Sequence, residues 1–280
     1  MPEAISGPAE TSRSAGPHSG QPASYWVRYE RPLIGLTAVG AILGLWEVVC
    51  RSGMIKPIFL SAPSQIGATA VRMFASGELV EHLRVSGAEF LMGYALALTA
   101  IPLGLMTGWY RRLNFALDPF LTALYVTPRV AFLPLIFLWI GLGLWSKVAI
   151  VFLGAFFPIC ISTIAGVRTV DAVHLRVARS FQATQRHLFL TIVLPSCVPF
   201  ILAGLRLGVG RALLGVVVGE LFGATAGIGY LISVAGSGFQ TDRLFVGVAV
   251  LATFGVLCNE VLVRLERRVE AWRPPAGGGQ

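Results

Sequence analysis

Charged side chains are scarce in this sequence: Asp, Glu, Lys and Arg together make up 13% of it, whereas hydrophobic residues make up 55%. A soluble domain of 280 residues could not cover its surface with so few charges. The mean hydropathy is +0.73. The apolar runs are also much longer than the roughly 10 residues of a membrane-spanning β-strand. The composition therefore excludes a soluble globular protein and predicts an all-α integral membrane protein.

The sequence also lacks the usual motifs of metal, nucleotide and catalytic chemistry. Its four cysteines lie in or beside apolar runs without a CxxC pattern, and its four histidines show no metal-type spacing. There is no GxxxxGK[ST] phosphate loop, and no Ser/His/Asp constellation can be assembled. The formal net charge of +8 does not indicate a nucleic-acid partner, because the arginines are scattered through loops. We expect no catalytic residue, no metal and no cofactor on this chain.

Six apolar runs predict six transmembrane helices within a domain of residues 33–265. The runs cover residues 33–50, 90–110, 120–144, 148–167, 199–221 and 244–262. A further helix outside the membrane is predicted to begin after Pro63. Residues 1–32, which begin with a stretch rich in Pro, Ser, Gly and Ala, are predicted to form a disordered tail, and residues 266–280 a second tail.

The loop charges orient these six spans. One side of the predicted membrane protein carries 13 Lys and Arg residues, the other side carries 6, and 3 arginines lie within spans. The richer side is expected to face the cytoplasm. Both termini and the loop between the fourth and fifth spans are therefore predicted to be cytoplasmic, in a multi-pass protein of the inner (plasma) membrane.

That loop, residues 168–195, is a long polar segment that reads RTVDAVHLRVARSFQATQRHLFLTIVLP. A helix over this segment would have an apolar side and a polar side. The apolar side would consist of Val170, Val173, Val177, Phe181 and Leu188, and the polar side of Arg176, Arg179, Gln182 and Arg186. Such a helix can dock a soluble protein or lie on the membrane surface, and the pattern alone favours neither.

Several motifs between residues 60 and 232 resemble permease subunits of ATP-binding-cassette importers, in the branch that handles nitrate, sulfonates, taurine and related small anions. The resembling runs are APSQI (62–66), LPLIFLWIGLG (133–143), FLGAFFPI (152–159), AGVRTVD (165–171), LP (194–195), GLRLGVGRALLGVVVGEL (204–221) and GIGYLI (227–232). The resemblance implies a translocation pathway for a small solute, such as the anions nitrate, sulfonate, taurine or bicarbonate. It also implies four partners: a second permease copy, a cytoplasmic ATPase dimer that binds ATP-Mg, an external substrate-binding protein and the lipid bilayer.

By this resemblance, residues 168–195 correspond to the coupling loop that inserts into a groove on the ATPase. The family motif there is Glu-Ala-Ala, three residues and then Gly, and the aligned residues of this chain are Arg176, Val177, Ala178 and Gln182. A Glu-to-Arg change reverses the charge at a protein contact, and a Gly-to-Gln change removes backbone freedom. The ATPase could be co-adapted, a second permease could keep the usual motif, or coupling could be impaired. The expected coupling residues are Asp171, Arg176, Val177, Ala178, Arg179, Phe181, Gln182, Leu194 and Pro195.

Charged and aromatic residues inside the predicted spans are candidates for the translocation pathway. An ion in the bilayer is costly, so such residues usually face a bundle interior, a partner or water, and a positive potential would suit an anion. The candidates are Arg129, Phe132, Trp139, Arg206 and Glu220, and Arg211 lies on the same span as Arg206. For the arginines, an interhelical salt bridge or snorkelling to the membrane surface is the alternative, and the aromatic residues could instead make core or lipid contacts.

Glycines recur at four-residue spacing along the fifth predicted span, at Gly204 and Gly208 and again at Gly215 and Gly219. Such spacing is typical of helices that pack closely in lipid, so these residues are predicted to lie at a helix contact.

Two other functions are compatible with a small helical membrane protein. A secondary transporter would be expected to carry acidic or polar mid-span residues and often an inverted repeat, and no obvious repeat is present. A non-transporting membrane scaffold is suggested by the altered coupling motif.

Overall fold

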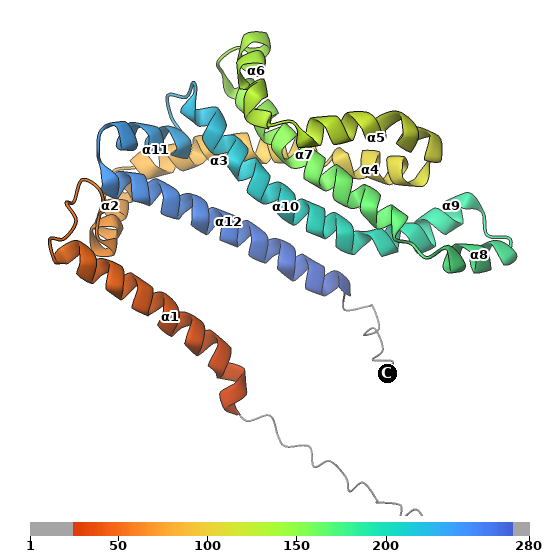
Figure 1. Ribbon diagram of the computed structural model, residues 1–280, viewed down its shortest axis with the longest axis horizontal. Helices are drawn as coiled ribbons and strands as arrows, with labels where there is room; N and C mark the ends of the chain where they lie inside the picture. The colour runs from red at the N-terminus through yellow and green to blue at the C-terminus, as the bar shows by residue number, and fades with distance from the viewer. Residues whose placement is uncertain (1–24, 271–280) are drawn as a thin grey trace, which may run out of the picture. The chain divides into compact units, whose positions relative to one another are not determined.

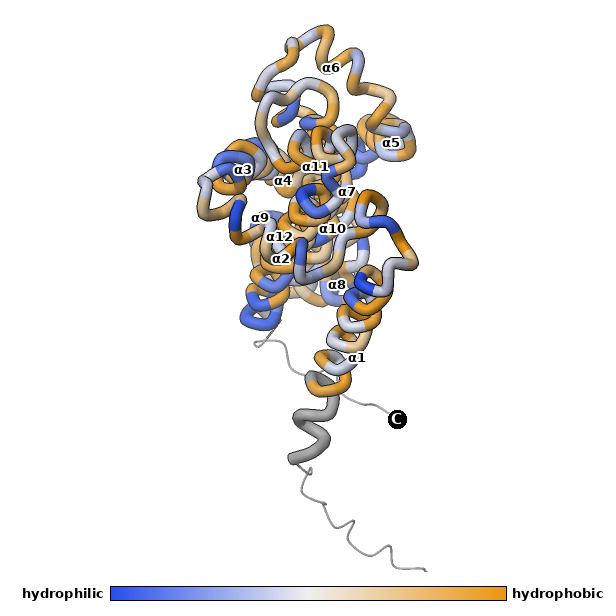
Figure 2. Tube along the Cα trace, turned by 90° about the vertical axis from the view of Figure 1, so that its left-hand side faces the viewer, coloured by the Kyte–Doolittle hydropathy of each residue, from blue (hydrophilic) through white to orange (hydrophobic). Residues whose placement is uncertain are grey.

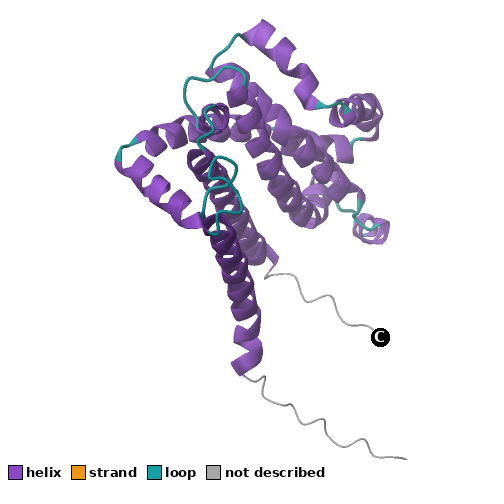
Figure 3. Ribbon diagram, turned by 60° about the vertical axis from the view of Figure 1, so that its left-hand side comes forward, coloured by secondary structure: helices purple, strands orange, loops and turns teal. Residues whose placement is uncertain are grey.

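The computed structural model describes residues 25–270, and every regular element in this range is a helix, as Figure 3 shows. This confirms the predicted all-α class. The α-helices are α1 (Tyr25–Arg51), α2 (Pro63–Ala75), α3 (Glu78–Ala97), α4 (Ala100–Trp109), α5 (Arg111–Val126), α6 (Leu133–Ile140), α7 (Leu144–Arg168), α8 (Ala172–Ser180), α9 (Gln185–Leu188), α10 (Leu194–Leu221), α11 (Ile228–Ser237) and α12 (Thr241–Glu270). A 3₁₀-helix, η1 (Arg129–Phe132), precedes α6, and a π-helix, η2 (Phe189–Val193), precedes α10.

Five stretches of helix are long and apolar enough to cross a membrane: Leu33–Arg51, Glu78–Trp109, Leu144–Arg168, Gln185–Leu221 and Thr241–Arg268. A sixth span exists only if α5 and the following helical segment, Val130–Ile140, are taken together, and these two are bent by 90°. The prediction of one continuous helix over residues 120–144 is therefore wrong. The chain is extended at Thr127, because a residue before proline is driven out of the α conformation, and it stays extended at Pro128.

Several predicted boundaries also need correction. Residues 25–32, predicted as part of the tail, belong to α1, and residues 266–270 belong to α12. The rest of the predicted tails lies outside the described residues. The second span begins at Glu78 rather than at residue 90, and the fourth begins at Leu144, so Lys147 lies within a helix.

The described chain divides into two units, the first ending at Val48 and the second beginning at Val49. Helix α7 is the central helix of the second unit. In its most apolar stretch 61% of the residues are buried, against 33% or less in the other spans. Its neighbours are α3, α4 and α10. The contact between α7 and α10 contains the fully buried residues Val151, Ala155 and Ala212, which form the middle of the core.

Glycines allow α7 and α10 to approach closely. The four glycines singled out from the sequence, Gly204, Gly208, Gly215 and Gly219, all face α7. At Gly215, for example, an added Cβ would lie 3.0 Å from the Cα of Val151. A side chain at such a position would force the two helices apart, because the nearest atom belongs to backbone.

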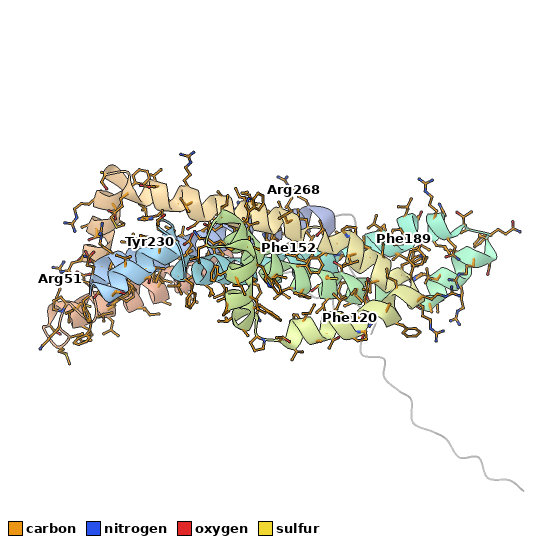
Figure 4. All side chains as sticks on the ribbon, turned by 90° about the horizontal axis from the view of Figure 1, so that it is seen from above. Arg51, Phe120, Phe152, Phe189, Tyr230 and Arg268 are labelled. Carbon is orange, nitrogen blue, oxygen red and sulfur yellow. The ribbon has the colours of Figure 1, made fainter. Side chains whose placement is uncertain are left out.

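The second unit has two distinct ends in Figure 1: α8 and α9 lie at one end, and α2 and α11 lie at the other. In the view from above, the labelled Phe189 and Tyr230 mark these two ends (Figure 4). Hydrophobic residues, coloured orange, recur throughout the helices in Figure 2. The end with α8 and α9 is called the coupling end below, and the end with α2 and α11 the α11 end.

Candidate functional site

The polar segment 168–195 forms two short helices rather than the single helix that its pattern predicted. Helix α8 begins after Asp171, whose Oδ1 accepts a hydrogen bond of 2.7 Å from the backbone N–H of Val173. A second N-cap follows at Thr184, which accepts a bond from the N–H of His187. From Gln185 the chain continues through α9 and η2 into α10 without leaving the helical conformation. Two capping residues within one segment divide it, because each cap starts a new helix.

Helix α8 is attached to the ends of the membrane-spanning helices by a small apolar cluster. Val167, Val193 and Cys197 are buried there, and Val170 and Leu175 pack against them. The aromatic rings of Trp109 and Phe189 add an edge-to-face contact with centroids 5.6 Å apart.

The other apolar side chains of α8 do not pack into this cluster. Val173 is 50% exposed, Val177 52% and Phe181 82%. The predicted apolar stripe therefore splits: Leu188 is fully buried in α9, whereas these three residues face outward. Between α8 and the start of α10 lies an open groove. Its lining residues are His174, Val177, Ala178, Phe181, Thr191, Ile192, Pro195 and Ser196. Arg176 and Arg179 are also exposed on α8.

Gln182 adopts a left-handed conformation, with φ of 58°. Its N–H donates to the carbonyl of Arg179, and the N–H of Ala183 donates to the carbonyl of Ala178. This is a Schellman motif, in which the residue after the helix end has a positive φ and is usually glycine. A positive φ favours glycine at this position, so the chain forms this turn with a residue less suited to it.

Glu220, a predicted pathway residue, is enclosed by protein at the α11 end, with 1% of its surface exposed. Its carboxylate accepts a hydrogen bond of 2.5 Å from the Ser86 hydroxyl and another from the backbone N–H of Gly229. In this conformation Glu220 therefore does not face an open pathway. It caps the first turn of α11, where a negative charge is favourable.

The residues around Glu220 explain why the GIGYLI run (227–232) begins with glycine. The N–H of Gly227 donates to Nδ1 of His82 at 3.0 Å, and the N–H of Ile228 donates to the Ser86 hydroxyl at 2.7 Å. Gly227 has φ of 126°, and a Cβ there would lie 2.3 Å from the Glu220 carboxyl carbon. Only glycine fits this close approach.

A buried ion pair lies in the same region. The Lys147 Nζ is 3.0 Å from Oε1 of Glu89, and the two side chains are 9% and 1% exposed. We did not predict roles for His82, Ser86 or Glu89. They are spaced by four and three residues, which places them on one face of α3. This spacing of polar residues was the feature of the sequence that could have predicted the network. His82, Ser86, Glu89, Lys147 and Glu220 are called the α11 network below.

Arg206 forms an ion pair with Glu266 of α12, so the interhelical salt bridge that was its alternative is present. Trp139 is 75% exposed on α6, and Phe132 is partly buried against the cluster around Leu133. Arg129 begins η1 beside the bend, and its side chain lies outside the described atoms. The structure does not bring these predicted pathway residues together with Glu220.

An open cleft of about 350 Å³ lies where the α5–η1 bend meets α7 and α10. Tyr125, Thr127 and Pro128 line it from the bend, and Arg211 lines it from α10. Among residues 25–270, no group of three or more His, Cys, Asp or Glu side chains is placed to hold a metal ion.

Comparison with known proteins identifies the family. Residues 100–271 match the model of the binding-protein-dependent transport system inner membrane component. The chain belongs to this family. The predicted resemblance to importer permeases is thereby confirmed, and the permease is a multi-pass protein of the inner membrane.

Three similar proteins cover most of the permease. The putative aliphatic sulfonates transport permease protein SsuC of Bacillus subtilis (strain 168) is 36% identical over 85% of this chain and 87% of its own length. The taurine transport system permease protein TauC of Escherichia coli (strain K12) is 31% identical over 88% of this chain and 92% of its own. The formylaminopyrimidine transport permease protein ThiX of Halalkalibacterium halodurans is 32% identical over 83% and 92%. These relatives are transport permeases, not enzymes.

Proposed function

We propose that this permease forms the translocation pathway of an ATP-driven importer for small organic anions that carry a sulfonate group. Two of the similar proteins named above are permeases for aliphatic sulfonates and taurine, and they match nearly the whole chain. An external binding protein delivers the anion, and two permease copies or a permease pair enclose the pathway. Both termini and the coupling end face the cytoplasm, in agreement with the distribution of Lys and Arg.

The observation that carries the ATP-driven part of this proposal is the exposed apolar face of α8. Val173, Val177 and Phe181 project from a helix that is already anchored through Leu175. Exposed aromatic and aliphatic side chains next to a groove are typical of a protein contact. The occupant is a separate ATPase subunit, which binds ATP-Mg and moves α8 as it closes.

In this proposal the ATPase subunit has a groove that is complementary to Arg176 and Gln182, the two residues that differ from the family motif. Arg176 and Arg179 would contact acidic groups on the ATPase where the usual Glu would contact basic ones. Gln182 keeps the turn that the family builds with glycine, so the shape of the coupling end is retained.

The test is to purify the permease from its native membrane with its partners, reconstitute the complex in proteoliposomes and measure uptake of taurine and methanesulfonate. We expect uptake that requires ATP and the binding protein, and hydrolysis that rises when the loaded binding protein is added. Nitrate and bicarbonate serve as competitors, and effective competition would shift the substrate to inorganic anions.

Two outcomes would contradict the proposal in different ways. Uptake driven by an ion gradient without an ATPase would favour a secondary transporter. Recovery of neither an ATPase nor any uptake would favour a membrane scaffold.

A further inference from the structure

Arg211 is a charged residue in the middle of a membrane-spanning helix. It lies ten residues before Leu221, the end of α10. At 1.5 Å per residue this is about 15 Å from the helix end, or half of the roughly 30 Å hydrocarbon thickness. A cation at this depth is unfavourable unless it faces a partner, protein or water, so its position requires an explanation.

Two other cations within the helical spans of the second unit have partners of opposite sign. Lys147 pairs with Glu89, and Arg206 pairs with Glu266. For Arg211, no ion pair or side-chain hydrogen bond is found within residues 25–270, and the residue is exposed. The permease therefore carries one mid-span guanidinium whose charge is not satisfied by its own described chain.

Arg211 instead lines the cleft at the α5–η1 bend. The cleft volume of about 350 Å³ lies within the range of small-molecule sites. Three elements form its walls: the bend, with the polar side chains of Tyr125 and Thr127; α7, with Ile150; and α10, with Leu214 and Arg211. The Thr127 hydroxyl donates to the carbonyl of Ala123, so Arg211 is the charged donor of the cleft. A cation on otherwise largely apolar walls is a suitable environment for one small organic anion.

The backbone at Arg211 is held in place by α7. A Cβ on Gly154 would lie 2.7 Å from the carbonyl oxygen of Arg211, and one on Gly215 would lie 3.0 Å from the Cα of Val151. The two glycines fix α10 against α7 on either side of Arg211, and both of them also line the cleft. The backbone position of Arg211 relative to α7 is thus set by a close helix contact.

We propose that Arg211 binds the anionic headgroup of the substrate on its passage through the permease, with Tyr125 and Thr127 on the opposite wall. The planar guanidinium offers paired N–H donors that match two oxygens of a sulfonate. The apolar wall accommodates the organic part. This inference rests on the proposed function, because it assigns the anion contact within the same pathway.

The test uses the complete complex with its ATPase and binding protein in proteoliposomes, with taurine and methanesulfonate as probes. Arg211→Gln is expected to lower the uptake of both sulfonates at least tenfold, and Arg211→Lys to restore part of it, since an ammonium keeps the charge but not the paired donors. ATP hydrolysis stimulated by the binding protein is expected to stay within twofold of wild type. Arg264→Gln removes an arginine from an exposed pair on α12 and serves as the matched control, with unchanged uptake.

The outcomes separate this inference from the proposed function. If the wild-type complex carries neither sulfonate, the proposed function fails, and this assignment with it. If the wild-type complex takes up both sulfonates and the uptake by Arg211→Gln is within twofold of the wild-type value, Arg211 does not bind the substrate. If Arg211→Gln loses uptake because the two permease copies no longer assemble, as size-exclusion chromatography would show, Arg211 pairs across the subunit contact and the inference is wrong.

Discussion

The two ends of the second unit use side chains in opposite ways. At the α11 end, charged and polar side chains are buried and bonded to their own chain, as in the contacts of Glu220 with Ser86 and of Lys147 with Glu89. At the coupling end, apolar side chains such as Phe181 are largely exposed. A buried polar network stabilises one arrangement of helices, whereas an exposed apolar face requires another molecule to cover it. The comparison indicates that the α11 end is rigid and that the coupling end is a surface for a partner.

The largest expected effect concerns the buried ion pair of the α11 network. Lys147→Met should destabilise the permease by about 3 kcal/mol or more, because Glu89 would be left buried without its partner. The measurement is the thermal unfolding midpoint in detergent, followed by tryptophan fluorescence. Arg264→Gln breaks the exposed pair with Glu260 and should cost less than about 1 kcal/mol.

A double variant makes this prediction independent of whether Lys147→Met folds. Lys147→Met combined with Glu89→Leu removes both charges and should recover most of the lost midpoint. A double variant as unstable as the single one would show that the ion pair is not the reason for the effect, and the α11 end would then not be the rigid end.

A smaller effect is expected at the coupling end, on binding rather than on stability. Phe181→Ala should weaken the complex with the ATPase about tenfold, equivalent to roughly 1.4 kcal/mol, because an exposed aromatic residue at a protein contact contributes strongly. The unfolding midpoint of the isolated permease should not change, since 82% of Phe181 is exposed. The affinity can be measured by titrating the ATPase against the permease in nanodiscs.

Phe74→Ala is the matched control for this prediction, since Phe74 is a phenylalanine at the α11 end with 63% exposure. It should leave the affinity for the ATPase unchanged. Equal losses in the two variants would remove the distinction between the two ends.

The smallest effect concerns the turn after α8. Gln182→Gly should stabilise this turn by about 1 kcal/mol, because glycine tolerates the positive φ better than glutamine does. Hydrogen exchange at the amides of Gln182 and Ala183 should slow about fivefold, the factor that corresponds to this energy. Gln182→Ala should give no such gain. If alanine slows exchange as much as glycine does, the left-handed conformation is not what limits the turn.

The sequence predicted the all-α class and the family well and the individual contacts poorly. Long apolar runs are the direct sequence signal of a membrane span. The first and fourth spans were therefore located to within a few residues, whereas α1 and α12 extend further along the chain than the apolar runs predicted. The bend at Pro128 was missed because α5 and α6 are each apolar, and a hydropathy pattern does not register the change of direction. The polar segment 168–195 was predicted as one helix and forms two, because the caps at Asp171 and Thr184 were not weighed against its amphipathic period.

The sequence by itself determined the membrane class, the order of the spans, the glycine-rich contact surface of α10 and the place of the polar segment 168–195. Each of these depends on residues close together along the chain. Only the tertiary structure decided that Glu220 caps α11 with Ser86, 134 residues away, and that Arg206 is paired while Arg211 lines a cleft. Both arginines read alike in the sequence, because the partner of a charge is set by which helices meet, and that is decided by packing across the whole unit.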